Sequence, residues 1–317
     1  MPDEFADDDL PRRLRAILGA ADVSELTRLS GGASRETWRF TADTQPLVLQ
    51  RQRAGDERDM AVEIAAVRAA FEAGVPAARV VAASTDPTRL GAAFVVTTNV
   101  AGETTPRKIL RDEQFTKARK MLPAQLADAL VRIHAIDPAV IPGLAQTDQI
   151  EHYREALDTL GQPHPAFELA LRWLDANRPA TTVDKVVHGD FRLGNVVVDA
   201  DGLRAVLDWE LVHLGDPMED LGWMCVKSWR FSSPKPAAGV GEYEELFEAY
   251  ETAGGCGVDR AAVHWWEVLG TLKWGIMCIM QANAHLTGVT RSHELAAIGR
   301  RVCENEHDLF LALEGHW

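Results

Sequence analysis

The chain lacks several features that mark common protein classes. Its four cysteines, spread over 317 residues, form no Cys-x-x-Cys pair and no cysteine–histidine group with zinc-ligand spacing. No apolar run is long enough to span a bilayer, and the first residues, MPDEFADDDL, lack the basic and apolar segments of a secretory signal. We therefore expect a cytoplasmic protein from a reducing compartment, without a structural zinc site or a membrane partner.

Positive charge is also scarce. The sequence has 33 Lys and Arg against 47 Asp and Glu, a net charge of −14. Because phosphate-backbone binding needs a basic surface, this balance argues against nucleic acid as a partner. Hydrophobic residues at 46% and charged residues at 25% are typical of a globular protein, and the length suits one large domain or two moderate ones.

The first hundred residues have the pattern of a small sheet. Short apolar or alternating stretches predict strands over 25–29, 36–41, 47–51, 79–83 and 92–97. Apolar residues at helical spacing predict one helix over 58–73. After residue 100 the pattern is mostly helical, with helices expected over 122–136, 148–160, 165–177, 217–229, 241–253, 260–286 and 291–313. The sequence thus predicts an α+β protein with a sheet-rich lobe over 1–100 and a helical lobe over 101–317.

One segment of the helical part reads instead as short strands around a polar loop, VVHGDFRLGNVVVDADGLRAVLDWE. Asp190 is followed by Asn195 and then by Asp208, which ends an apolar strand. A carboxylate at such a place is costly unless a cation compensates it, and an amide oxygen with a carboxylate suits Mg²⁺. Kinase-like enzymes use this arrangement for phosphoryl transfer, with the first Asp as base. We therefore predict Asp190 as the catalytic base and Asn195 and Asp208 as magnesium ligands.

Three motifs, HGDFRLGN (188–195), LDWE (207–210) and GDPMEDLGW (215–223), carry a family resemblance. The sequence resembles the aminoglycoside phosphotransferase and choline kinase superfamily, and within it the branch of phosphotransferase domains fused to some acyl-CoA dehydrogenases. The resemblance implies a protein-kinase-like two-lobed fold, Mg²⁺, and ATP or GTP as phosphate donor. It implies a small-molecule hydroxyl as acceptor, for which the branch favours an apolar or acyl-type metabolite and an aminoglycoside is the alternative. The oligomeric state is left open.

The first lobe supplies the expected nucleotide contacts. Glycine lets a chain approach phosphates closely, so the turn with Gly31, Gly32 and Ser34 could bind them, although a plain hairpin turn would look the same. Thr98 and Asn99 fall in the expected linker between the lobes, whose backbone would meet the adenine edge.

The resemblance further implies a basic residue on the third strand, paired with a glutamate on the next helix. Glu63 fits the glutamate, but Gln50 stands where the basic residue is expected. Three alternatives remain: Gln50 binds phosphate as a neutral donor, a bulge brings Arg51 inward, or Arg53 contributes. The same departure motivates a different hypothesis, a nucleotide-binding pseudokinase without turnover.

The acceptor site is expected in the helical lobe. Trp265, Trp266 and Trp274 in the segment 264–274 could line an apolar pocket or belong to the core. Lys273 and Arg230 are candidate groups for an anionic substrate. We predict structural roles for three polar residues around the motif, His188, Asp216 and Asp220.

Overall fold

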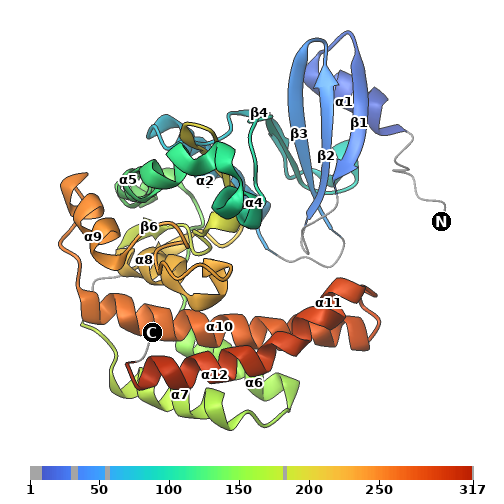
Figure 1. Ribbon diagram of the computed structural model, residues 1–317. Helices are drawn as coiled ribbons and strands as arrows, with labels where there is room; N and C mark the ends of the chain where they lie inside the picture. Colours follow the sequence, from blue (N-terminus) through green and yellow to red (C-terminus); the bar gives the residue numbers. More distant parts are fainter. Residues whose placement is uncertain (1–8, 30–34, 54–57, 181–183, 316–317) are drawn as a thin grey trace.

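The computed structural model describes residues 9–29, 35–53, 58–180 and 184–315. It has the expected two-lobed, kinase-like α+β architecture (Figure 1). The first lobe contains α1 (Leu10–Leu18), β1 (Val23–Leu29), β2 (Arg35–Ala42), β3 (Gln45–Gln52), α2 (Met60–Glu72), β4 (Val80–Ser84), α3 (Pro87–Leu90) and β5 (Phe94–Thr98). The strands form one antiparallel sheet in the order β1-β2-β3-β5-β4. All five predicted strands are therefore confirmed, within a few residues at their ends.

Side-chain alternation gives this sheet two different faces. One face is apolar: Trp38, Phe40, Leu47 and Leu49 are buried there with residues of α1. The opposite face meets α2, whose Met60 and Ile64 pack around Val95 of β5. Because Gln50 is paired with Val95 across β3 and β5, it belongs to this second face, which turns toward the other lobe.

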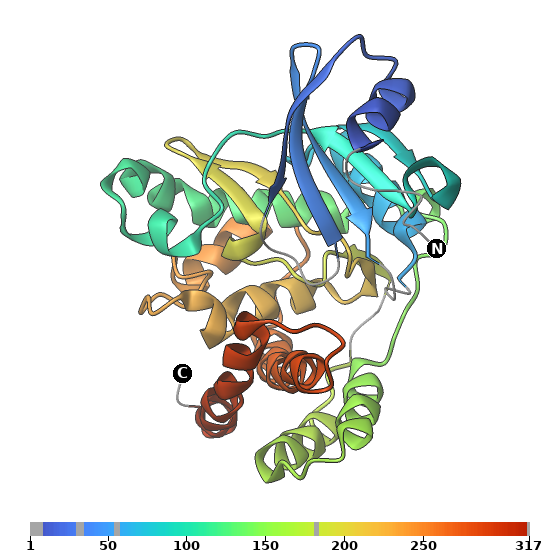
Figure 2. The same ribbon diagram turned by 90° about the vertical axis from the view of Figure 1, so that its right-hand side faces the viewer.

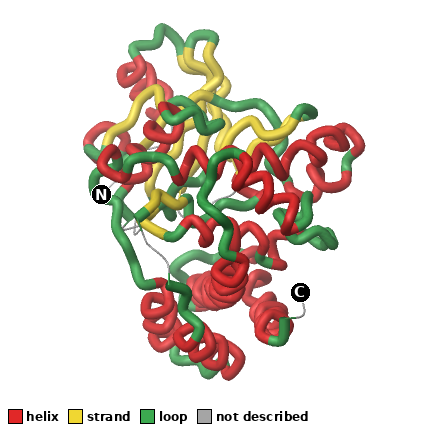
Figure 3. Tube along the Cα trace, turned by 90° about the vertical axis from the view of Figure 1, so that its left-hand side faces the viewer, coloured by secondary structure: helices red, strands yellow, loops and turns green. Residues whose placement is uncertain are grey.

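The second lobe consists mainly of helices. They are α4 (Pro106–Arg111), α5 (Thr116–His134), α6 (Gln149–Leu160), α7 (Pro165–Ala176), α8 (Pro217–Cys225), α9 (Tyr243–Thr252), α10 (Arg260–Leu286), α11 (His293–Ile298) and α12 (Val302–Leu313). Two small antiparallel strand pairs interrupt them: β6 (Lys185–Val187) with β9 (His213–Gly215), and β7 (Val196–Asp199) with β8 (Gly202–Val206). Figures 2 and 3 show the first-lobe sheet at one end of the molecule and helices α6, α7, α10 and α12 at the other.

Two predicted helices differ from the structure. The helix expected over 217–229 ends at Cys225, and a short 3-10 turn over Lys227–Arg230 follows it. The helix expected over 291–313 is divided into α11 and α12 by another 3-10 turn, Gly299–Arg301. At Val226 the backbone leaves the helical conformation, with φ −51° and ψ 132°, whereas between α11 and α12 the residues keep helical angles and the chain only tightens into a 3-10 turn. Apolar periodicity alone shows neither change.

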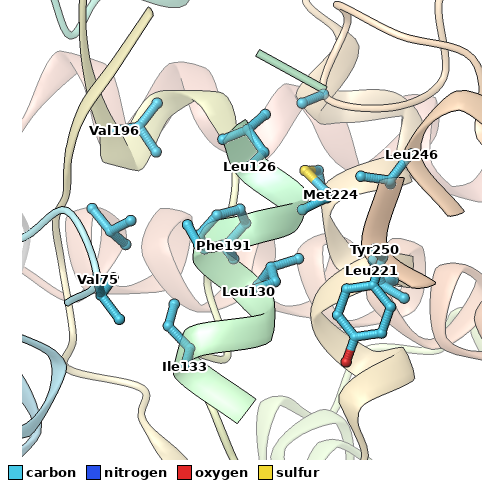
Figure 4. Packing of buried hydrophobic residues seen from close by; sticks show 14 of the residues in the cluster. Val75, Leu126, Leu130, Ile133, Phe191, Val196, Leu221, Met224, Leu246 and Tyr250 are labelled. Atoms are coloured by element: carbon cyan, nitrogen blue, oxygen red, sulfur yellow. The ribbon is translucent and has the colours of Figure 1, made fainter. Parts of the chain in front are cut away.

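The largest core joins the two lobes. Ala66 and Ala70 of α2 belong to a buried cluster that also contains Leu130 and Ile133 of α5. Figure 4 shows the two α5 residues in this cluster. Thus α2 belongs to the first lobe by sequence but packs on the second. We keep the predicted division near residue 100 as a proposal, since the sheet ends at Thr98 and the next helix begins at Pro106. Within the described ranges, no helix is both long and apolar enough to cross a membrane.

Candidate active site

The polar loop between β6 and β7 is anchored to the hydrophobic core by a buried side chain. Phe191, directly after Asp190, is fully buried beside Leu130 and Ile133 of α5 (Figure 4). Gly189 has φ +77°, and a Cβ there would lie 2.5 Å from the carbonyl oxygen of Leu211. Only glycine fits such a backbone position without strain. The sequence Gly-Asp-Phe therefore turns the Asp190 side chain away from the core.

Three side chains donate hydrogen bonds to the Asp190 carboxylate. Trp223 Nε1 and Arg192 Nε lie 2.7 Å and 2.9 Å from Oδ1, and Asn195 Nδ2 lies 2.6 Å from Oδ2. These donors come from α8 and from the loop itself. They hold the carboxylate in one orientation, as a positioned general base requires.

A second carboxylate, Asp220 of α8, holds the backbone of the same loop. Its two oxygens accept from the backbone N–H groups of His188, at 2.8 Å, and Gly189, at 2.9 Å. Burial alone would raise the pKa of Asp220, but the hydrogen bond from His134 and the nearby imidazoles keep it below its usual value. The predicted structural role of Asp220 agrees with these contacts.

His188 has the scaffold environment expected for it. Its Nε2 lies 3.0 Å from the Leu207 carbonyl oxygen, and its Nδ1 accepts from the Asp190 backbone N–H at 3.2 Å. Burial lowers the pKa of this imidazole, so the ring is neutral with Nε2 as donor. His188 thus joins the loop to the strand end that precedes Asp208.

Asn195 and Asp208, the predicted metal ligands, are brought together by the β7–β8 pair. The backbone N–H of Leu207 donates to the Asn195 carbonyl oxygen at 2.8 Å. The Asn195 amide nitrogen donates to Asp190. The side-chain oxygen of Asn195, Oδ1, is therefore the atom that could bind a metal. Asp208 has φ +65°, a left-handed conformation that non-glycine residues adopt rarely.

The Asp208 carboxylate is electrostatically unbalanced. Burial, followed by the charges of Glu210 and Asp190, raises its pKa to about 7. The described residues include no group of three or more His, Cys, Asp or Glu side chains placed to hold a metal ion. Mg²⁺ commonly uses only one or two carboxylates together with phosphates and water. One side-chain oxygen of Asn195 and the carboxylate of Asp208 therefore fit an Mg²⁺ ion that is also bound by the phosphates of a nucleotide.

Glu63 is paired, but not with the third strand. Its Oε2 lies 2.7 Å from an Nη of Arg35 on β2, and both side chains are buried. Gln50 lies on the same sheet face. Arg51 does not turn inward: β2 and β3 pair without a bulge, and Arg51 bonds Glu36 at 2.7 Å on the opposite face. The alternative of an inward Arg51 is therefore wrong.

The linker residues contact their own lobe. The backbone N–H groups of Thr98 and Asn99 donate to the carbonyl oxygens of Arg79, at 2.9 Å, and Pro46, at 3.0 Å. These donors are thus engaged, and Val100 and Ala101 follow in the linker. Gly31, Gly32 and Ser34 lie outside the described residues.

A cavity of about 420 Å³ opens between the lobes beside this loop. It is lined by α2, by the start of α6, by the segment 210–213 and by Lys273 of α10. The Lys273 ammonium donates to the Gly189 carbonyl oxygen at 3.0 Å and lies over the Trp223 ring. Lys273 thus links the wall of the cavity to the backbone of the loop that carries Asp190.

Arg230 and Trp265, two of the residues considered for the acceptor site, are engaged elsewhere, and so is Glu210 of the LDWE motif. Arg230 and Glu267 form a buried pair at 2.8 Å. Glu210 pairs with Arg58 at 2.6 Å. Trp265 is buried among α6, α7 and α10 residues, so the core interpretation holds for it.

Sequence reasoning missed Arg35, Arg192 and the contact of Trp223 with Asp190. Arg192 is two residues from Asp190, and its proximity was a usable signal. Trp223 follows Asp220 by three residues on one helix, a spacing that places both on the same face. For Arg35 the signal required the strand register, which the sequence does not give.

Comparison with known proteins agrees with this geometry. A model of the phosphotransferase enzyme family matches residues 25–266, and the chain belongs to this family. Mouse acyl-CoA dehydrogenase family member 10 is 28% identical over 250 residues, which cover 71% of this chain and 22% of the mouse protein. This chain thus spans about a quarter of the length of the curated relatives it matches.

Solved structures share the fold. A choline/ethanolamine kinase family protein from Mesorhizobium loti has a TM-score of 0.68 and 22% identity, covering 95% of this chain and 94% of that one. A spectinomycin phosphotransferase in complex with ADP and spectinomycin has a TM-score of 0.68 and 13% identity, covering 98% and 99%. At these identities the likeness concerns the fold.

Proposed function

We propose that this protein transfers the γ-phosphoryl group of Mg²⁺-bound ATP, or of GTP, to a hydroxyl group of a small molecule. The main observation that supports this proposal is the arrangement of Asp190, Asn195 and Asp208. One carboxylate is oriented by three donors, and next to it an amide oxygen and an unbalanced carboxylate lie at the ends of paired strands. Family membership supports the same reaction class.

In this mechanism Asp190 orients the acceptor hydroxyl and accepts its proton as the new P–O bond forms and the bond to the leaving nucleoside diphosphate breaks. Trp223 and Arg192 keep the carboxylate directed at the acceptor. Asn195 and Asp208 would hold Mg²⁺, which when bound neutralises charge on the β- and γ-phosphates. Arg192 also places a positive charge beside the reacting groups.

We further propose that the acceptor occupies the cavity between α2, α6 and α10. Its acidic residues are largely neutralised, since Glu63 pairs with Arg35 and Glu210 with Arg58. Lys273 lines it and has no carboxylate within ion-pair distance among the described residues. Such a site is poorly suited to a polycation and suits a neutral or anionic metabolite with apolar parts. This supports the apolar or acyl-type acceptor, consistent with relatives that are acyl-CoA dehydrogenase family members.

An aminoglycoside acceptor is the second candidate, because a structural neighbour was solved with spectinomycin bound. A nucleotide-binding protein without turnover is the third, motivated by Gln50. The two carboxylates and Asn195 argue against it, since a binding module needs no oriented base.

The test is nucleotide consumption with a panel of acceptors: hydroxy acids, their thioesters, amino alcohols and aminoglycosides. Each is assayed with ATP and GTP, with Mg²⁺ or with excess EDTA, for wild type and Asp190→Ala. We expect Mg²⁺-dependent turnover with a hydroxylated acid or thioester, lost in the variant. Turnover on aminoglycosides alone would exclude the proposed acceptor class. Tight nucleotide binding without turnover on any acceptor would support the binding module instead.

A further inference from the structure

Two arginine–glutamate pairs occupy opposite faces of the first-lobe sheet. Arg35 and Glu63 lie on the face turned to the second lobe, with N–O distance 2.7 Å, and both are about 95% buried. Arg51 and Glu36 lie on the other face, also at 2.7 Å, but are partly exposed beside Trp38. The first pair joins β2 to α2, and the second joins two neighbouring strands.

The register shows why Arg35 reaches the position left by Gln50. In the β2–β3 pair, Arg35 is opposite Gln52 and Thr37 is opposite Gln50. Residues two apart on a strand share a face, so Arg35 and Gln50 are diagonal neighbours on the same face. A side chain as long as arginine spans this diagonal. The cation thus reaches the helix glutamate from the adjacent strand.

Glu63 of this pair lies near Asp208, one of the predicted metal ligands. The Glu63 charge is one of those that raise the pKa of Asp208, and Glu63 lines the cavity between the lobes. Arg35 begins β2 directly after the glycine-containing turn of the sequence. Through its ion pair with Glu63, the Arg35 guanidinium is linked to the side of the first lobe that faces Asp208.

Stability alone does not account for this pair. Burying two charges costs desolvation energy that their attraction rarely exceeds, and burial indeed raises the pKa of Glu63 in spite of Arg35. Arginine presents five N–H donors in one plane, so it can bond a carboxylate and a phosphate at the same time. A neutral glutamine at residue 50 cannot supply the charge.

We propose that Arg35, on the second strand, binds the nucleotide phosphates in place of the basic residue that the third strand lacks. Glu63 orients the guanidinium. This inference rests on the proposed function, because it assumes that a Mg²⁺–nucleotide binds between the lobes. It removes the reason for regarding the chain as a pseudokinase.

The test compares binding of Mg²⁺–ATP with binding of adenosine, which has no phosphates, by calorimetry on the full chain. Arg35→Gln is expected to raise the Kd of Mg²⁺–ATP about ten- to a hundredfold, because a charged hydrogen bond to phosphate is lost. The Kd of adenosine should change less than about threefold. If wild type prefers guanine nucleotides, Mg²⁺–GTP and guanosine are used as ligands instead of Mg²⁺–ATP and adenosine. Arg51→Gln is the matched control, and its ATP-to-adenosine affinity ratio should equal that of wild type.

A second variant moves the positive charge to the third strand, where the family resemblance implies a basic residue. Gln50→Lys in the Arg35→Gln background should recover most of the lost Mg²⁺–ATP affinity. An unchanged affinity ratio in Arg35→Gln, an equal loss of adenosine binding, or no recovery with Gln50→Lys would each overturn the proposal. If wild type turns over an acceptor and Arg35→Gln has the same Mg²⁺–ATP to adenosine affinity ratio as wild type, only this inference fails. If wild type binds no nucleotide, the proposed function fails with it.

Discussion

Asp190 and Asp208 are both partly buried carboxylates at the ends of short strands, yet their surroundings are opposite. Asp190 accepts hydrogen bonds from Trp223, Arg192 and Asn195. Asp208 accepts none from any described side chain and carries a pKa raised to about 7. The first is oriented by the protein itself, while the second is left for a ligand to neutralise. This difference separates a base from a metal ligand, although the residue type is the same.

The largest effect should come from removing the oriented carboxylate. Asp190→Ala is expected to lower kcat about a thousandfold, because proton transfer then has no positioned base. Its Kd for Mg²⁺–nucleotide should stay within about threefold of wild type. Steady-state kinetics with the acceptor from the panel, beside calorimetry, measures both. Retention of kcat within tenfold would remove Asp190 from the role of base.

The second effect should appear in binding. Asp208→Ala is expected to raise the Kd of Mg²⁺–nucleotide about ten- to a hundredfold, as for a lost charged interaction. Nucleotide binding in EDTA should change little. Asp190→Ala provides the comparison, and an equal or greater loss of metal-dependent binding in that variant would reverse the two roles.

The pH dependence of binding sharpens the same comparison. A metal ligand must be deprotonated, and Asp208 has a pKa of about 7 in the ligand-free protein. Mg²⁺–nucleotide affinity should therefore fall about tenfold from pH 8 to pH 6. The control is Asp208→Asn, which removes this titration and leaves that of the nucleotide itself. Parallel pH profiles for the two proteins would contradict the assignment.

The smallest effect concerns the stability of the ligand-free protein. A carboxyl whose folded pKa is raised favours folding at low pH and loses that contribution as pH rises through the folded value. Asp208→Asn should therefore raise Tm by about 2 °C at pH 8 and have no effect below about pH 4. Differential scanning fluorimetry without metal or nucleotide would detect this. The exposed Asp112→Asn should leave Tm unchanged, and an equal rise there would indicate a general charge effect.

The candidate metal and base residues could be predicted because they are local. Asp190, Asn195 and Asp208 lie within nineteen positions of one another, and the strands between them are short apolar runs. Strand β7 pairs directly with β8 through a turn that the sequence displays, so the approach of Asn195 to Asp208 follows from the hairpin.

Residues held by distant contacts could not be predicted in this way. Arg35 meets Glu63 across 28 positions, and its face is known only from the register of β2 with β3. Trp223 belongs to the motif GDPMEDLGW, but the sequence does not show that its indole N–H donates to Asp190. Periodicity specifies a face but not the partner on that face.

Helix α8 has a further consequence. All nine of its residues are buried, and it carries both Asp220, which fixes the loop backbone, and Trp223, which fixes the base. It meets α10 so closely that a Cβ at Gly222 would lie 2.6 Å from Trp266, and one at Gly270 would lie 2.7 Å from Val226. The α8–α10 pair is therefore a frame that tolerates little redesign. Acceptor preference would be re-engineered by substituting the residues at the start of α6 that line the cavity, with the chemistry left in place.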